Sequence, residues 1–166
     1  MGFAFNHPGT SGLMTPNQYC NRANWLGVFF LIRPSNSVTS NLMSKIIFIG
    51  LAGLVGTLGR YWLSGLIARQ YGETFPWGTL VVNAIGCFFA GAIFCLTEER
   101  FLISPTVRTI VLIGLLGGFT TFSSYGLQTF TLLREGELGL AMVNVTVSNL
   151  LGLLLVWIGY TLVKAL

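Results

Sequence analysis

The chain has 166 residues, of which 53% are hydrophobic and only 8% are charged. Soluble domains usually carry about 25% charged residues, so this composition excludes an ordinary soluble domain and predicts an integral, multi-pass membrane protein. The formal net charge is +4, but the basic residues are scattered along the chain rather than gathered in a stripe, which argues against a nucleic-acid-binding protein.

The first 42 residues differ in composition from the rest, because they are rich in Asn, Ser, Thr, Gly and Pro. Their one apolar run, residues 25–32, is too short to span a bilayer. A signal peptide is not indicated either, since Arg33-Pro34 follows the run where small residues should mark a cleavage site. We expect translation to begin at Met43, which would make residues 1–42 a non-core extension and residues 43–166 the membrane domain.

Four stretches of the membrane domain are long and apolar enough to cross a hydrocarbon core, which needs roughly 20 residues per helix: residues 46–68, 77–96, 107–133 and 139–163. The connections between them are short, which predicts one compact all-α bundle in contact with lipid. If the connections lie on alternate sides, the basic residues divide four against two: Lys45, Arg100, Arg108 and Lys164 on one side, Arg69 and Arg134 on the other. So small a bias hardly fixes an orientation, and an antiparallel homodimer is therefore allowed.

The first helix contains Gly50, Gly53, Gly56 and Gly59, spaced for close helix packing. Arg60 follows them inside the apolar stretch, where a basic side chain costs at least about 2.5 to 3.5 kcal/mol unless it snorkels or finds a partner. Two interpretations stay open. Arg60 lies near the membrane interface beside the aromatic residues Tyr61 and Trp62, or it attracts anions in a wet vestibule.

The second and fourth helices carry polar side chains within apolar surroundings. Asn83 of the second helix offers both hydrogen-bond donors and an acceptor, so it either bonds a neighbouring helix or donates to a dehydrated anion. Asn144, Ser148 and Gly152 recur every fourth residue of the fourth helix and form a polar stripe. Asn83 and Ser148 are thus candidates for one polar track.

The third stretch is interrupted by a glycine- and hydroxyl-rich segment, residues 117–126. A lipid-exposed break leaves backbone groups unpaired, so it survives at membrane depth only where protein buries it or where it lines a polar pathway. We therefore predict two half-helices, one before Gly117 and one after Gly126. Half-helix amino-terminal ends favour anions and unwound carbonyls coordinate cations such as sodium, so both kinds of site are available.

Phe122 and Tyr125 share a face if this segment is helical there. Aromatic pairs commonly pack, but the positive edge of an aromatic ring also stabilises a small anion. The hydroxyls of Thr121 and Ser123 are further candidate donors.

Catalytic chemistry has little support in the sequence. Aspartate is absent and His7 is the single histidine, so one chain assembles neither a histidine-based metal site nor a Ser-His-Asp triad. The three cysteines, Cys20, Cys87 and Cys95, match no metal or redox spacing. We predict that the protein is not an enzyme.

Three segments resemble the small bacterial fluoride channels of the Fluc or CrcB family: residues 56–61 (GTLGRY), residues 78–88 (GTLVVNAIGCF) and residues 117–123 (GGFTTFS). The resemblance covers residues 43–166. It implies a dual-topology antiparallel homodimer in the bacterial inner membrane, with two pores that export fluoride passively from the cytoplasm. It further implies a central structural sodium ion held by the main-chain carbonyls of Gly117 and Thr120. The pore residues that carry over are Asn83, Phe122 and, on the fourth helix, Ser148.

Two positions depart from the common pattern of this family, since Tyr125 replaces a second pore phenylalanine and Gln128 replaces a glutamate. The alternative function by size and topology is a proton-coupled exporter of the small multidrug resistance type. Such exporters need a carboxylate within the membrane, whereas the five acidic residues here all fall in the predicted connections. A third alternative is a packing scaffold, which explains the glycines but not the polar break, Asn83 and the aromatic pair together.

Overall fold

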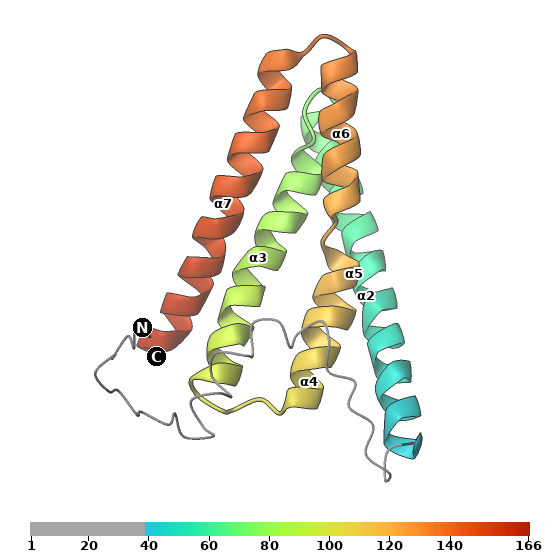
Figure 1. The fold of residues 1–166 in the computed structure, drawn as a ribbon. Helices are drawn as coiled ribbons and strands as arrows, with labels where there is room; N and C mark the ends of the chain where they lie inside the picture. Colours follow the sequence, from blue (N-terminus) through green and yellow to red (C-terminus); the bar gives the residue numbers. More distant parts are fainter. Residues whose placement is uncertain (1–38) are drawn as a thin grey trace, which may run out of the picture. The chain divides into compact units, whose positions relative to one another are not determined.

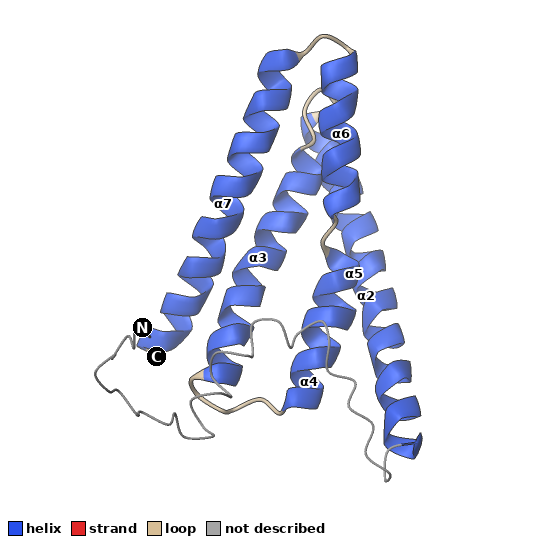
Figure 2. Ribbon diagram, in the orientation of Figure 1, coloured by secondary structure: helices blue, strands red, loops and turns tan. Residues whose placement is uncertain are grey.

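The computed structural model describes residues 39–166, and all of its elements are helices (Figures 1 and 2). Four stretches are long and apolar enough to cross a membrane, which confirms the predicted all-α membrane fold. Cys20, His7, the apolar run at residues 25–32 and the proposed extension up to residue 38 lie outside the described residues. The proposed start at Met43 stays a prediction.

The first two spans are single helices, α2 (Thr39–Tyr71) and α3 (Trp77–Glu98). Helix α2 begins at Thr39 rather than at residue 46, so it includes residues 39–42, which the sequence assigned to the extension. A tight turn with Gly72 at φ 79° ends α2, a backbone conformation that glycine adopts at no steric cost.

The third span consists of α4 (Pro105–Thr109), the π-helical stretch η1 (Ile110–Leu116), α5 (Gly117–Phe119) and α6 (Phe122–Arg134). The break between α5 and α6 is confined to Thr120 and Thr121, both of which are extended. The predicted break over residues 117–126 was therefore too wide, because residues 122–126 already belong to α6. Figure 1 shows α6 continuing beyond the break at a changed angle.

The fourth span is α7 (Leu138–Ala165), which packs along α3, while α2 lies against η1 and α5 (Figure 1). Glycines allow both contacts. A Cβ atom on Gly159 of α7 would lie 2.0 Å from the Phe88 carbonyl oxygen of α3, and one on Gly56 of α2 would lie 2.1 Å from the Leu115 carbonyl oxygen. Both helix pairs thus approach at backbone distance, as small residues permit within membranes.

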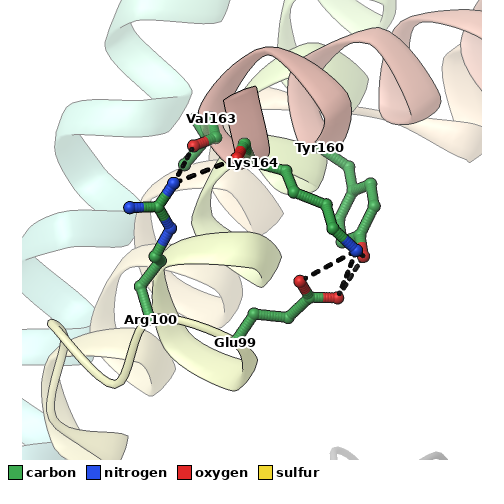
Figure 3. A network of polar contacts seen from close by, with 5 residues as sticks. All are labelled: Glu99, Arg100, Tyr160, Val163 and Lys164. Carbon is green, nitrogen blue, oxygen red and sulfur yellow. Dashed lines mark hydrogen bonds and ion pairs between the residues drawn. The ribbon is translucent and has the colours of Figure 1, made fainter. Parts of the chain in front are cut away.

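A polar network ties the loop after α3 to the end of α7 (Figure 3). Arg100 donates to the carbonyl oxygens of Val163 and Lys164 at 3.3 and 3.0 Å, which satisfies carbonyls that the last turn of a helix leaves free. Glu99 accepts from the Tyr160 hydroxyl and pairs with Lys164. The Tyr160 hydrogen bond, followed by that of Lys164, lowers the pKa of the Glu99 carboxyl below its ordinary value. Glu99 is thus held in its charged form at this end of the bundle.

The same loop contains a residue with a left-handed backbone. Phe101 has φ 52° and its side chain is 83% exposed. This conformation costs a residue with a Cβ atom about 1 to 2 kcal/mol, whereas glycine adopts it freely. We expect Phe101→Gly to raise the free energy of unfolding in detergent by up to about 1 kcal/mol, measured by thermal or denaturant unfolding.

Leu102→Gly is the matched control, because Leu102 is 72% exposed and its φ is not positive. This variant should lower stability, since glycine adds freedom to the unfolded chain. A loss of stability in Phe101→Gly as large as that in Leu102→Gly would contradict the assignment of strain.

Candidate functional site

The break between α5 and α6 is held by one side chain of α3. Asn83 donates from Nδ2 to the Thr121 carbonyl oxygen at 3.1 Å, and its Oδ1 accepts from the Thr121 N–H at 2.8 Å. The amide therefore pairs with both backbone groups of Thr121, and it gives the Thr121 N–H an acceptor in place of the helical one that the break removes. Of the two interpretations of Asn83, the structure shows the bond to a neighbouring segment of the chain, and the donation to an anion stays a prediction.

The Gly118 carbonyl is covered from α2. Arg60 donates from Nε to the Gly118 oxygen at 3.1 Å, and the Thr57 hydroxyl lies 3.5 Å from the same oxygen. Arg60 thus reaches the protein interior, whereas its neighbours Tyr61 and Trp62 are 79% and 67% exposed. The hydrogen bond from the Arg60 guanidinium group to the Gly118 carbonyl explains how a basic side chain is accommodated within a span.

The break deprives several carbonyls of their regular helical donors, among them those of Gly117 and Thr120. In a continuous helix the Thr121 N–H would bond to the Gly117 oxygen, but here it donates to Asn83. The Ser124 N–H would bond to the Thr120 oxygen, but it donates to the Thr121 hydroxyl at 3.2 Å and so caps α6. The two carbonyls predicted to bind sodium are thus among those whose helical donors bond elsewhere.

A groove of about 400 Å³ runs beside the break, and we call it the break groove. Five of the six predicted pore residues line it, together with the two predicted sodium ligands: Asn83, Thr121, Phe122, Tyr125 and Ser148, with Gly117 and Thr120. The structure thus brings together residues from α3, the broken helix and α7. Ser123 is the exception, because it does not line the groove; its hydroxyl lies 3.2 Å from that of Thr121.

The aromatic pair stands at the open side of the break groove. Phe122 and Tyr125 share one face of α6, with ring centroids 5.5 Å apart and planes tilted by 45°. Phe122 is 81% exposed, so within one chain its ring has little protein around it. Tyr125 is partly covered, and its hydroxyl accepts a hydrogen bond from Asn149 of α7 at 3.2 Å.

A second cavity, of about 800 Å³, also lies against the break, and we call it the vestibule. Arg60 lines it, as do residues of the α2–α3 loop with Glu73, the later turns of α6, and Glu135 and Glu137 of the α6–α7 connection. Thr121 lines both cavities, so both the vestibule and the break groove lie against the break. Gln128 also lines the vestibule, and its Oε1 is buried with no hydrogen-bond partner among the described residues.

Sequence reasoning missed three polar residues that support this site. Thr57 touches the Gly118 carbonyl, Thr129 accepts from the buried Asn144 at 2.8 Å, and Asn149 bonds to Tyr125. Asn149 is an amide in an apolar helix, which is the signal that could have found it, but it lies outside the four-residue stripe of Asn144, Ser148 and Gly152.

The chain is similar to a known family of proteins. Residues 47–160 match the protein family described as CrcB-like protein, Camphor Resistance (CrcB). A relative from Opitutus terrae named fluoride-specific ion channel FluC is 53% identical over 120 residues, which cover 71% of this chain and 91% of the relative. Relatives of the same name from Nitrosococcus oceani and Geobacter sp. (strain M21) are 47% and 44% identical, over 73% and 75% of this chain and 97% and 100% of the relatives.

Proposed function

The chain belongs to the CrcB family, whose curated relatives are named fluoride-specific ion channels, and from this premise we propose the route by which fluoride crosses it. The chain is a multi-pass membrane channel for fluoride, located in bacteria in the inner membrane, and a transport protein rather than an enzyme. Fluoride passes between the vestibule and the break groove and leaves the cytoplasm passively, which lowers its toxicity.

The observation that carries this route is the convergence of anion-stabilising groups in the break groove. The amino-terminal end of α6 opens there, and the partial positive charge of a helix amino terminus favours anions. The rings of Phe122 and Tyr125 flank it and offer their positive edges. The second Nδ2 hydrogen of Asn83 is a polar donor in the same groove, which the Ser148 side chain also lines. These groups are uncharged, so they support entry of a dehydrated anion without holding it tightly.

The vestibule supports an aqueous approach to the break. Its lining includes Glu73, Glu135 and Glu137 in the connections and the Arg60 side chain, which bonds to the Gly118 carbonyl and favours anions next to the break. Thr121, shared by both cavities, is the point at which fluoride passes from one to the other. On this proposal Arg60 stands at the entrance of the pathway rather than in its narrow part.

We also propose a structural sodium ion at the break. The Gly117 and Thr120 carbonyls suit it because their helical donors bond elsewhere, and unwound carbonyls of broken helices coordinate sodium. Bound there, the ion would neutralise these oxygens and fix the break. Two oxygens from one chain are few, since oxygen-ligated hard cations such as Ca²⁺ and Mg²⁺ take about six ligands. A second copy of the chain would supply an equivalent pair.

An antiparallel homodimer in two orientations follows as the proposed assembly, with one pore in each half of the molecule. Phe122 is the side chain that most needs a partner, because it is exposed and yet stands beside the break groove. The small charge bias supports dual insertion: of the four basic residues at one end, Arg108 pairs with Glu98 and Lys164 pairs with Glu99. The remaining exposed apolar surface would face lipid.

The distribution of acidic residues favours a channel over a proton-coupled exporter. Glu98 is the last residue of α3, and Glu73, Glu99, Glu135 and Glu137 lie in connections. Within the spans of the described chain, a carboxylate therefore lies only at the end of α3, where Glu98 pairs with Arg108 rather than serving a coupling proton in the membrane.

Fluoride efflux from proteoliposomes, followed with a fluoride electrode, tests this function. Vesicles containing the full chain and loaded with fluoride should empty passively when a potassium ionophore balances charge, whereas protein-free vesicles should not. Protein prepared without sodium should lose efflux and regain it when sodium is restored. Efflux no faster than in empty vesicles, together with uptake of a cationic drug against a proton gradient, would favour the exporter instead.

A further inference from the structure

The Tyr125 hydroxyl is held by a side chain of the neighbouring helix. The Nδ2 atom of Asn149 lies 3.2 Å from this hydroxyl oxygen and 2.7 Å from the Val145 carbonyl oxygen. A carbonyl oxygen can only accept a hydrogen bond, so the atom near Val145 must be the amide nitrogen. An amide nitrogen donates two hydrogens and accepts none. One hydrogen goes to Val145, the other to Tyr125, and the Tyr125 oxygen therefore acts as the acceptor.

This direction leaves the hydrogen of the Tyr125 hydroxyl unused by Asn149. The other three hydroxyls that line the break groove have acceptors within the protein: Thr120 donates to the Leu116 carbonyl at 2.9 Å, Thr121 to Ser124 at 3.1 Å, and Ser148 to Asn144 Oδ1 at 3.3 Å. Tyr125 is thus the hydroxyl of the break groove whose hydrogen has no protein acceptor among the described residues.

Helix α7 also fixes the backbone beneath Tyr125. Asn144, which is 2% exposed, donates to the Thr129 hydroxyl at 2.8 Å, and Thr129 donates to the Tyr125 carbonyl at 2.8 Å. Asn144 and Asn149 therefore hold Tyr125 at both of its ends from the same helix. The ring is kept beside Phe122 with its hydroxyl at the groove.

We infer that Asn149 is a positioning residue that makes the Tyr125 hydroxyl a hydrogen-bond donor to fluoride. The inference rests on the proposed passage of fluoride along the break groove. A hydrogen bond to an anion is about twice as strong as one between neutral groups, and a hydroxyl that already accepts one bond donates more strongly. Asn149 thus leaves the hydrogen of the Tyr125 hydroxyl available to the groove and strengthens the hydrogen bond that this hydroxyl donates. The phenylalanine common at this position in the family lacks this donor.

Four variants test the inference in the fluoride-efflux assay: Tyr125→Phe, Asn149→Leu, both together, and Thr161→Val. Loss of one hydrogen bond to an anion changes a rate by about tenfold, so Tyr125→Phe and Asn149→Leu should each slow efflux by about this factor. The double variant should be no slower than Tyr125→Phe alone, because Asn149 acts through the hydroxyl. A role of Asn149 in packing would slow efflux in both backgrounds.

Thr161→Val is the matched control, since Thr161 also bonds to a backbone carbonyl one turn earlier in α7, that of Trp157 at 2.9 Å, but lines neither cavity. Its efflux should equal that of the unmodified protein. Full efflux in Tyr125→Phe, which removes a single oxygen atom, would overturn the inference even if Asn149→Leu failed to assemble. Absence of efflux in the unmodified protein would instead overturn the proposed function.

Discussion

Asn83→Asp should abolish fluoride efflux and destabilise the protein. The substitution replaces the Nδ2 donor by an oxygen atom at the position that lies 3.1 Å from the Thr121 carbonyl oxygen, so an attraction becomes a repulsion. An acidic side chain at the centre of a span also costs about 2.5 to 3.5 kcal/mol. A carboxylate in the break groove further opposes anion entry, because like charges 4 Å apart repel by about 4 kcal/mol at an effective dielectric constant of about 20.

The measurement must separate an effect on folding from an effect on conduction, because Asn83 both bonds to the backbone of the break and lines the break groove. We expect a lower unfolding temperature in detergent, and an efflux rate per folded protein that falls by more than about tenfold. Gln70→Glu is the control, because it adds the same charge at an exposed residue near the end of α2. Unchanged efflux per folded Asn83→Asp protein would remove Asn83 from the fluoride path and leave it a purely structural role.

Gly118→Ala should be the second severe substitution. A Cβ atom at Gly118 would lie 2.4 Å from the Gly53 carbonyl oxygen and 3.1 Å from the Gly53 Cα atom. Both atoms are backbone, so no side chain can turn away, and α2 must separate from the broken helix. Overpacking of this kind costs about 1 to 3 kcal/mol or more. We expect lower thermal stability, together with weaker efflux, because Arg60 would lose its position at the Gly118 carbonyl.

Gly126→Ala is the matched variant in the same segment. Gly126 lies in α6, and a methyl group added there would meet no neighbouring atom within 4 Å. Alanine therefore enters open space and favours the helix by about 1 kcal/mol. This variant should keep efflux and raise stability slightly. Equal stability of the two variants would contradict the close approach of α2 to the break.

Much of this site was visible in the sequence because its polar residues are conspicuous in an apolar chain. Asn83, Ser148 and the glycine- and hydroxyl-rich segment were all selected for that reason, and the structure gathers them around one groove. Ser123 was selected on the same grounds but does not line the groove. The sequence identifies a polar residue, but it does not show on which side of a half-helix that residue lies.

The width of the break and the partners of Arg60 were beyond sequence reasoning. Residues 122–126 contain glycine and serine, which suggested an unwound chain, yet they form the first turns of α6. A threonine cap and the bonds of Asn83 limit the unwound part to Thr120 and Thr121. Arg60 had two interpretations of equal merit, and its bond to Gly118 depends on a contact 58 residues along the chain.

The sequence by itself determined the membrane class, the four spans and the presence of a polar interruption in the third, because hydropathy and backbone hydrogen bonding in lipid act over local stretches of chain. Only the tertiary structure decided which backbone groups of that interruption are satisfied, and by which helix. Asn83 bonds to the backbone of Thr121, and Arg60 bonds to the Gly118 carbonyl. The N–H groups that would bond to the Gly117 and Thr120 carbonyls in a continuous helix have other acceptors. These assignments depend on how α2, α3 and α7 approach the break, which no local pattern specifies.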